Sequence, residues 1–132
     1  MLEIYIDAAS AGNPGKSGIG VFIKGEGHHL QISEYIGETN NHEAEFRALI
    51  RALKEAQQLQ SQLISVRSDS NIVVSSIEKR YVKKAEFKPL LEEALTLADT
   101  FDLFFIKWIP SSENKAADAL ARRAIQQGKG TD

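Results

Sequence analysis

The sequence predicts an α/β domain in which helices flank a mixed five-stranded sheet, with the element order β-β-β-α-β-α-α-β-α. Three observations support this prediction. Three strand-like segments with short connections open the chain, two further apolar segments follow, and amphipathic helical patterns separate them. The chain has 132 residues, of which 42% are apolar and 26% charged, a balance that suits one domain with its own core.

The first three segments predict an antiparallel meander, because only short turns separate them. Residues 2–7 alternate apolar and polar side chains and predict a strand that ends at Asp7. Residues 8–15 are rich in turn formers and predict a loop. Residues 18–24 and 29–37 predict the second and third strands.

A helix follows, for which Asn40 is the expected N-cap and Glu43 completes a capping-box pattern. Its apolar stripe comprises Leu49, Ala52, Leu53 and Ala56. Residues 63–68 predict the fourth strand, which ends at Asp69, and a short helix then runs to about Glu78.

The rest of the chain predicts two more helices around the last strand. Pro89 can begin a helix over residues 87–99. Residues 102–109 predict the fifth strand, and its Trp108 and neighbouring Phe residues are expected in the core. The last helix is expected from about residue 114. The predicted domain covers residues 1–127, and residues 128–132 are expected to form a flexible tail.

Composition narrows the functional class. The chain has no cysteine, which excludes disulfides and thiolate metal sites. It shows no signal-peptide pattern and no apolar segment long enough to span a membrane, so a cytoplasmic protein is expected. The net charge of −2 argues weakly against a nucleic-acid binder, but five cations crowd into one short segment: Lys79, Arg80, Lys83, Lys84 and Lys88.

Four acids occupy positions that favour a metal-binding or catalytic role over simple exposure to solvent: Asp7, Glu45, Asp69 and Asp118. Asp7 and Asp69 follow apolar strands, and ligands of open α/β sheets favour the carboxyl ends of strands. Glu45 continues the apolar stripe of its helix, where an unpaired carboxylate would be costly to bury. Asp118 lies in an alanine-rich helix that can pack closely on the sheet.

Each acid also has an ordinary structural interpretation. Asp7 could belong to a turn, Glu45 could favour the positive end of the helix dipole, and Asp69 could cap the following helix. Asp118 could be a solvated residue paired with Arg122, four positions later. Two neighbouring strands that each end in an aspartate indicate a metal site more strongly than either aspartate alone.

Four carboxylates from separate elements, without a histidine cluster, favour Mg²⁺ as the bound metal ion. Two-metal hydrolysis of a phosphodiester needs oxygen ligands for two hard cations about 3.5–4 Å apart. One ion generates and orients the attacking hydroxide, and the other stabilises the leaving 3′ oxygen. We therefore expect two Mg²⁺ ions, for which Mn²⁺ can substitute.

The segments around these acids closely resemble the motifs of the ribonuclease H family, type 1 (ribonuclease HI-like), from Leu2 to about Arg123. The four matching segments are Asp7-Ala8-Ala9-Ser10-Ala11-Gly12-Asn13-Pro14-Gly15, Asn41-His42-Glu43-Ala44-Glu45, Ser68-Asp69-Ser70 and Asn114-Lys115-Ala116-Ala117-Asp118-Ala119-Leu120-Ala121. Each motif alone is weak or moderate, but four in the right order make a strong match.

The resemblance implies an endonuclease that hydrolyses the RNA strand of an RNA–DNA hybrid and leaves 5′-phosphate and 3′-hydroxyl ends. It implies that the four acids bind the metal ions. It also implies that five polar residues contact the hybrid near the cut: Ser10, Asn13, Asn41, His42 and Asn71. Short polar groups suit this role, because the 2′-OH that marks RNA lies in a shallow minor groove.

The chain departs from the family pattern in four places. Ala8 replaces a usual Gly, and His42 replaces a second Asn found in many members. The segment between residues 79 and 88 is too short for the basic protrusion of some members. Its Lys79, Arg80, Lys83 and Lys84 are either a phosphate grip in its place or a solvated basic face. The loop of residues 110–113 lacks the mobile His of many members, for which Glu113 is a candidate substitute.

Two other functions remain open at this point. The chain could be a weakly active or non-catalytic module that binds RNA–DNA hybrids, since the loop His and the protrusion are missing. It could also be a nuclease of the same fold that acts on double-stranded RNA. The expected partner is in either case a nucleic acid. No membrane partner is expected, and the protein is expected to be a monomer.

Overall fold

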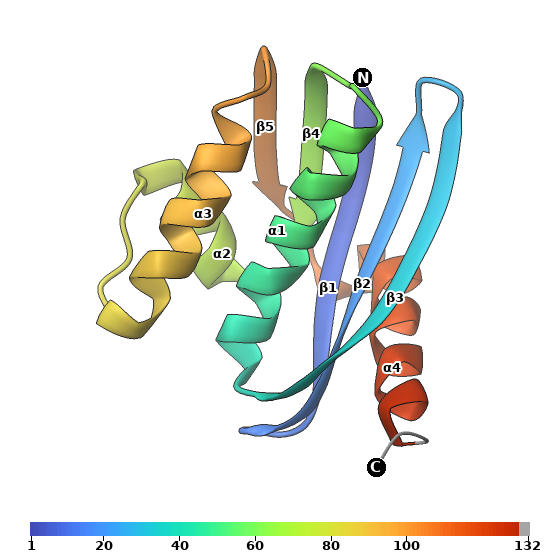
Figure 1. Cartoon of the computed structure of the whole chain (residues 1–132), viewed down its shortest axis with the longest axis vertical. Coiled ribbons are helices and arrows are strands. Elements are labelled where there is room, and N and C mark those ends of the chain that lie inside the picture. Colours follow the sequence, from blue (N-terminus) through green and yellow to red (C-terminus); the bar gives the residue numbers. More distant parts are fainter. Residues whose placement is uncertain (130–132) are drawn as a thin grey trace.

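The structure is a computed structural model that describes residues 1–129. Five strands form one mixed sheet in the spatial order β3-β2-β1-β4-β5 (Figure 1). An antiparallel meander comprises β1 (Leu2–Gly12), β2 (Gly15–Gly25) and β3 (His28–Thr39). β4 (Leu63–Ser68) pairs in parallel with β1, and β5 (Leu103–Trp108) pairs in parallel with β4.

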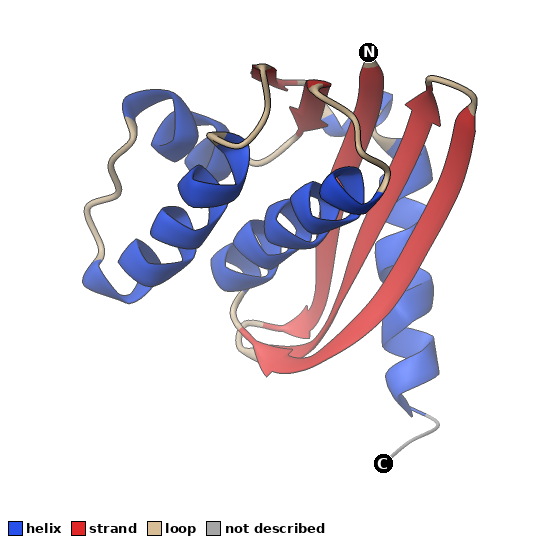
Figure 2. Ribbon diagram, turned by 45° about the horizontal axis from the view of Figure 1, so that its top comes forward, coloured by secondary structure: helices blue, strands red, loops and turns tan. Residues whose placement is uncertain are grey.

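Helices cover the sheet from both sides. They are α1 (Asn41–Gln58), α2 (Asn71–Lys79), α3 (Lys88–Ala98) and α4 (Lys115–Lys129), with short 3-10 turns η1 (Ala85–Phe87) and η2 (Ser111–Glu113). α1, α2 and α3 lie on one side of the sheet, and α4 lies across the opposite face (Figure 2). The predicted fold class and element order are confirmed.

The main core lies between the sheet and α1. Ile4 and Ile6 of β1 are fully buried and pair across the sheet with Ile23 and Val21 of β2. The predicted apolar stripe of α1 packs on this surface, because Leu49, Ala52, Leu53 and Ala56 are fully buried. Asn40 caps α1 as predicted, since its Oδ1 accepts a hydrogen bond of 2.8 Å from the Glu43 amide.

On the opposite face, glycines of β2 allow α4 to approach closely. A Cβ added at Gly20 would collide with the carbonyl oxygen of Ala117, and one at Gly18 would collide with Ala121 and Ala124. The alanine-rich helix therefore packs directly against the strand backbone, as its small residues predicted.

The three meander strands are longer than predicted. β1 passes Asp7 and continues to Gly12, so the prediction of a strand ending at Asp7 and a loop over residues 8–15 is wrong. The reason is that residues 8–12 continue the antiparallel pairing with β2, through to Gly12 opposite Gly15. Small residues there match the turn composition of a loop, but their backbone groups complete the ladder.

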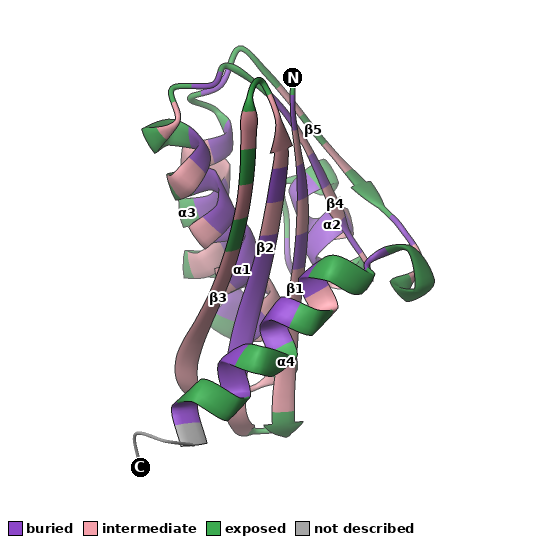
Figure 3. Ribbon diagram, turned by 90° about the vertical axis from the view of Figure 1, so that its right-hand side faces the viewer, coloured by how far each residue is buried: buried purple, intermediate pink, exposed green. Residues whose placement is uncertain are grey.

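The side chains on β5 are less buried than predicted. Trp108 is 48% exposed and Phe105 is 52% exposed, so the assignment of Trp108 and its neighbours to the core is wrong for these two residues. β5 is an edge strand, and α2 and α3 lie on only one side of it. Alternate side chains therefore point toward a face that no helix covers at this edge (Figure 3).

The last helix also exceeds its predicted end. α4 includes residues 128 and 129, which corrects the prediction of a tail from residue 128. Gly128 is buried against the ring of Tyr35, where any Cβ would collide, so this contact holds the end of the helix on β3. The remaining predicted tail, residues 130–132, lies outside the described residues. Within residues 1–129, no helix has both the length and the apolar character needed to cross a membrane.

Candidate active site

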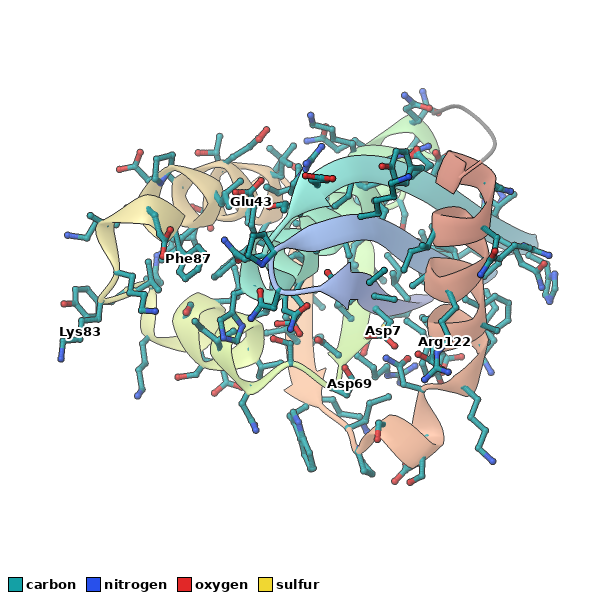
Figure 4. All side chains as sticks on the ribbon, turned by 90° about the horizontal axis from the view of Figure 1, so that it is seen from below. Asp7, Glu43, Asp69, Lys83, Phe87 and Arg122 are labelled. Carbon is teal, nitrogen blue, oxygen red and sulfur yellow. The ribbon has the colours of Figure 1, made fainter. Side chains whose placement is uncertain are left out.

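The register between β1 and β4 brings two of the four acids together. The parallel ladder ends with Ile6 opposite Ser68, and Asp7 and Asp69 are the next residues on each chain segment. Figure 4 shows both side chains at this end of the sheet. Although β1 continues past Asp7, its edge toward β4 becomes free at this point, so Asp7 still occupies the end of a parallel strand pair.

The packing of α4 supplies the third acid. Asp7 pairs with Gly20 across the sheet, and Ala117 of α4 lies against Gly20, so the adjacent Asp118 comes close to Asp7. Asn114 fixes this arrangement, because its Nδ2 donates a 2.8 Å hydrogen bond to the carbonyl oxygen of Ile6. Asn114 is 1% exposed, and its backbone carbonyl oxygen accepts a hydrogen bond from the backbone amide of Asp118.

Burial and mutual repulsion set the charge state of this cluster. The pKa of Asp7 is raised from 3.8 to about 8, first because the carboxyl group is buried and then because Asp69 and Asp118 are close. A hydrogen bond from the Ala8 amide to Asp7 Oδ1, at 2.8 Å, opposes part of this rise. Because oxygen ligands with excess negative charge converge here, the donor set fits a hard divalent cation.

Glu45 lies at the edge of this cluster and is linked to it through α2. Its side chain is 23% exposed, and its Oε2 accepts a 2.6 Å hydrogen bond from Ser70 Oγ and lies 3.3 Å from His42 Nδ1. Ser70 directly follows Asp69, so the hydrogen bond ties the start of α1 to the loop that carries Asp69.

Glu45 and Asp118 each have a side-chain partner outside the acidic cluster. Arg122 Nε donates to Asp118 Oδ1 at 3.1 Å, which is the ion pair considered as the structural alternative for Asp118. Among residues 1–129, no three or more His, Asp or Glu side chains are already grouped closely enough to hold a metal ion. A cation bound here would therefore have to draw Glu45 and Asp118 away from their present partners.

The alternative role of Asp69 as a helix cap is wrong. Ser70 caps α2, because its Oγ accepts from the Val73 amide at 3.3 Å. The backbone carbonyl of Asp69 instead accepts a 3.1 Å hydrogen bond from Trp108 Nε1. The Asp69 side chain is thereby left for the acidic cluster.

Sequence reasoning missed the roles of Ser70, Trp108 and Asn114, although Ser70 stands where an N-cap is expected before a helix.

The predicted substrate contacts line the same end of the molecule. Asn13, in the β1–β2 turn, accepts a 3.1 Å hydrogen bond from the Asn41 amide at the start of α1. Asn41 and Asn71 are exposed first residues of their helices, and His42 packs edge-on against Phe87 with its side chain 50% exposed. Ser10 differs, because its hydroxyl is hydrogen-bonded to Ser17 Oγ at 2.7 Å.

The basic segment divides into two parts. Lys79, Lys83 and Lys84 line a hollow of about 370 Å³ together with His42 and Tyr81. Figure 4 shows Lys83 pointing outward, far from Asp7 and Asp69.

Arg80 instead forms a bidentate ion pair with Asp99, in which its two terminal guanidinium nitrogens donate to the carboxylate oxygens at 2.7 and 3.1 Å. The structure therefore groups three of the four predicted phosphate contacts and not the fourth.

Glu113, in η2, is exposed and lines a different hollow, which includes Tyr5 and Lys24.

The fold matches solved ribonuclease H structures. The RNase H1 of the halophilic archaeon Halobacterium salinarum NRC-1 superposes with a TM-score of 0.89 at 31% identity, covering 96% of this chain and 98% of that chain. LC11-RNase H1, solved in complex with an RNA/DNA hybrid, gives 0.89 at 34% identity, covering 97% and 99%. These matches define an α/β domain of the ribonuclease H fold.

Sequence comparisons give the family. A family model described as reverse transcriptase-like matches residues 6–124. The ribonuclease H of Bartonella tribocorum is 31% identical, covering 96% of this chain and 90% of that protein. The putative hydrolase EbsB of Enterococcus faecalis is 46% identical, covering 96% of both. The chain also spans about a third of a bifunctional Mycobacterium tuberculosis protein, at 34% identity. The chain belongs to the ribonuclease H family and is a hydrolase of the ribonuclease HI-like type.

Proposed function

We propose that this enzyme hydrolyses the RNA strand of RNA–DNA hybrids with the help of two divalent cations, Mg²⁺ or in its place Mn²⁺. The observation that carries the proposal is the convergence of Asp7, Asp69 and Asp118. Burial of the Asp7 carboxyl group, followed by the proximity of the other two acids, raises its pKa to about 8. The similarity to hybrid-bound LC11-RNase H1 supports the same substrate. We further propose that the enzyme acts as a monomer in the cytoplasm.

In this proposal Asp7, Asp69, Asp118 and Glu45 hold the cations. The bound cations would activate water and stabilise the leaving 3′ oxygen, so that 5′-phosphate and 3′-hydroxyl ends result. The protein contributes a rigid frame, because Asn114 joins α4 to β1 and Ser70 joins α2 to Glu45. Such pre-organisation is the usual contribution of a protein to phosphoryl chemistry.

The substrate would lie over the N-termini of α1 and α2. Asn13, Asn41 and Asn71 are exposed there and offer short polar groups to the minor groove, where the 2′-OH distinguishes RNA. Ser10 shares its hydroxyl with Ser17 and would contribute mainly through the shape of the turn. Lys79, Lys83 and Lys84 would contact phosphates farther along the hybrid, with Arg80 restrained by Asp99. A role for Glu113 in product release remains part of the proposal.

The test is cleavage of an end-labelled RNA–DNA hybrid with Mg²⁺ or Mn²⁺, beside matched RNA–RNA and DNA–DNA duplexes. We expect cleavage of the RNA strand of the hybrid only. Asp69→Asn and Asp7→Asn should abolish cleavage while the circular dichroism spectrum stays native. Either variant retaining nearly full activity would remove that residue from the metal site.

Two results would redirect the assignment. Cleavage of the RNA–RNA duplex at a comparable rate would favour a double-stranded RNA nuclease. Tight hybrid binding without cleavage, in a protein that divalent metal still stabilises, would favour a binding module. In that case the absence of a loop His and of a long basic protrusion would be the first features to restore.

A further inference from the structure

One half of the sheet face that carries α4 has no helix over it. Figure 3 shows α4 across one half of the strands, whereas the half nearer the N-terminus of β1 is open. The strand register places Tyr5 of β1 beside Phe22 of β2 and Arg67 of β4 on this face. Lys24 lies on the same face, two residues after Phe22 along β2.

The two aromatic rings lie against each other. The Tyr5 and Phe22 rings lie 6.0 Å apart between centroids, with their planes within 29°, and His29 contacts Phe22 edge-on at 5.2 Å. Both rings are half-buried, so the backbone and their neighbours hold them in place. Aromatic side chains on a sheet are groups on which nucleic-acid bases stack.

Two cations lie over the Tyr5 ring, and Glu3 is adjacent to both of them. Lys24 Nζ lies 5.7 Å and Arg67 Cζ lies 5.3 Å from the centroid of Tyr5. Arg67 is held by a 2.7 Å ion pair with Glu3, while its Nε is buried without a hydrogen-bond partner. Lys115 lines the same hollow. Glu113 also lines the hollow, so one carboxylate lies among these cations. Aromatic rings beside lysines are complementary to the bases and phosphates of a single nucleic-acid strand.

The hollow adjoins the acidic cluster. Its volume is about 280 Å³, enough for one nucleobase, and its lining combines Tyr5, Phe22 and Lys24 with residues 112–116. Asn114 lies in that lining and is hydrogen-bonded to Ile6, the residue between Tyr5 and Asp7 along β1. A strand that leaves the acidic cluster on the α4 side therefore meets this surface directly.

We propose that this hollow, lined by Tyr5, Phe22, Lys24 and residues 112–116, binds the first unpaired nucleotide of a single-stranded extension next to the hybrid. One base stacks on Tyr5 and Phe22, and its phosphate contacts Lys24 and Lys115. The surface would thereby direct the enzyme to hybrids at the junction with a single strand. The assignment of this strand to the substrate rests on the proposed function.

The test compares affinities for a blunt RNA–DNA hybrid and for the same hybrid with a single-stranded extension. The extension is placed on the RNA or the DNA strand and at either end, which identifies the strand that binds. Fluorescence anisotropy is measured on the Asp69→Asn protein, so that the hybrid is not cut. We expect one extension to lower Kd about tenfold, the effect of one base stacked on an aromatic ring.

Substitutions in the hollow should remove this gain and leave blunt-hybrid binding unchanged. Lys24→Gln tests the cation, and Tyr5→Leu tests stacking while Tyr5→Phe should retain it. Lys54→Gln is the matched charge control, because Lys54 lies on α1 at the opposite face and pairs with Glu93. If Tyr5→Leu fails to fold, Lys24→Gln still decides the result.

The outcomes separate this inference from the proposed function. Equal affinity for all extended and blunt hybrids, in a wild-type enzyme that cleaves the blunt hybrid, would overturn the single-strand site alone. A gain that persists in both Lys24→Gln and Tyr5→Leu would also overturn it. Failure of the wild-type enzyme to cleave any hybrid would instead contradict the proposed function.

Discussion

At the scale of single residues, Asp7 combines burial with two acidic neighbours, and this combination determines its protonation. Its carboxyl group lies where the β1–β4 ladder ends and where α4 brings Asp118 close. In the protein alone, Asp7 therefore holds a proton up to about pH 8, while in the unfolded chain it releases one near 3.8. Proton and metal ion must compete for the same oxygens.

This protonation makes stability depend on pH in a direction that can be measured. Between about pH 4 and 8 the folded protein binds more protons at Asp7 than the unfolded chain, so the free energy of unfolding falls as pH rises. In a chelator, we expect Tm to fall over this range more steeply for the wild type than for Asp7→Asn. Parallel pH profiles for the two proteins would show that Asp7 titrates normally.

Asn114 is the residue whose loss should uncouple α4 from β1. Its side-chain amide is buried and donates to the Ile6 carbonyl beside Asp7. Asn114→Ala should lower the free energy of unfolding by about 1–3 kcal/mol, because a buried carbonyl loses its partner. It should also lower kcat, because Asp118 then lies on a less restrained helix.

Urea denaturation and steady-state cleavage measure these two effects. Gln58→Ala, an exposed change in α1, serves as the control and should alter stability by less than about 0.5 kcal/mol. An Asn114→Ala protein as stable and as active as this control would show that the hydrogen bond has no such role.

At the scale of elements, the contact between α4 and β2 positions the third acid. Gly18 and Gly20 leave room for Ala117, Ala121 and Ala124, so helix and strand backbones nearly touch. Asp118 follows Ala117 directly, and its place beside Asp7 therefore depends on this close approach. The glycines of β2 therefore influence the acidic cluster although they carry no side chain.

Gly20→Ala should push α4 away from the sheet. The new Cβ would meet backbone atoms of Ala117 and Ala121, which cannot swing aside, so we expect a loss of about 1–3 kcal/mol or more. Activity should fall further than stability alone explains, because Asp118 moves with the helix. Thermal unfolding and cleavage at a temperature where the variant is folded give the two quantities.

Gly37→Ala is the matched control for the Gly20 substitution. Gly37 has a φ of 81°, but no atom lies within 4 Å of an added Cβ. An alanine there introduces backbone strain alone and should cost about 1 kcal/mol with no specific loss of activity. Equal effects of the two substitutions on cleavage would contradict the role of the α4–β2 contact.

At the scale of the whole molecule, the four acids proposed to bind metal come from four elements that are distant in the sequence. Asp7 comes from β1, Glu45 from α1, Asp69 from the β4–α2 connection and Asp118 from α4. A cation that binds all of them would cross-link the sheet to helices on both of its sides. Metal binding should therefore stabilise the entire domain and not one local segment.

Millimolar Mg²⁺ should accordingly raise Tm by several degrees, because a ligand that binds only the folded state stabilises it. The increase should disappear in an Asp7→Asn, Asp69→Asn double variant, and equal ionic strength supplied as KCl should not reproduce it. An unchanged Tm in the wild type would count against the metal site itself. The assay needs no substrate and is independent of the cleavage experiment.

Much of this architecture follows from the sequence. The alternation of β1, the Asn40 cap and the bounds of β4 are local features, so periodicity and turn chemistry predicted them. The spacing of the motifs also led to the ribonuclease H family, which the comparisons bear out. These properties depend on residues that are neighbours along the chain, and the sequence displays those directly.

Tertiary structure decided what surrounds each of these features. The extension of β1 past Asp7 depends on its ladder with β2, and the exposure of Trp108 depends on β5 lying at an edge that no helix covers on one side. The hydrogen bond between Glu45 and Ser70 likewise comes from the packing of α1 against the start of α2. By itself the sequence determined which elements form and predicted which acids lie near one end of the sheet. Burial, pKa and the long-range hydrogen-bond partners were decided only by folding, because they arise from contacts between residues far apart in the chain.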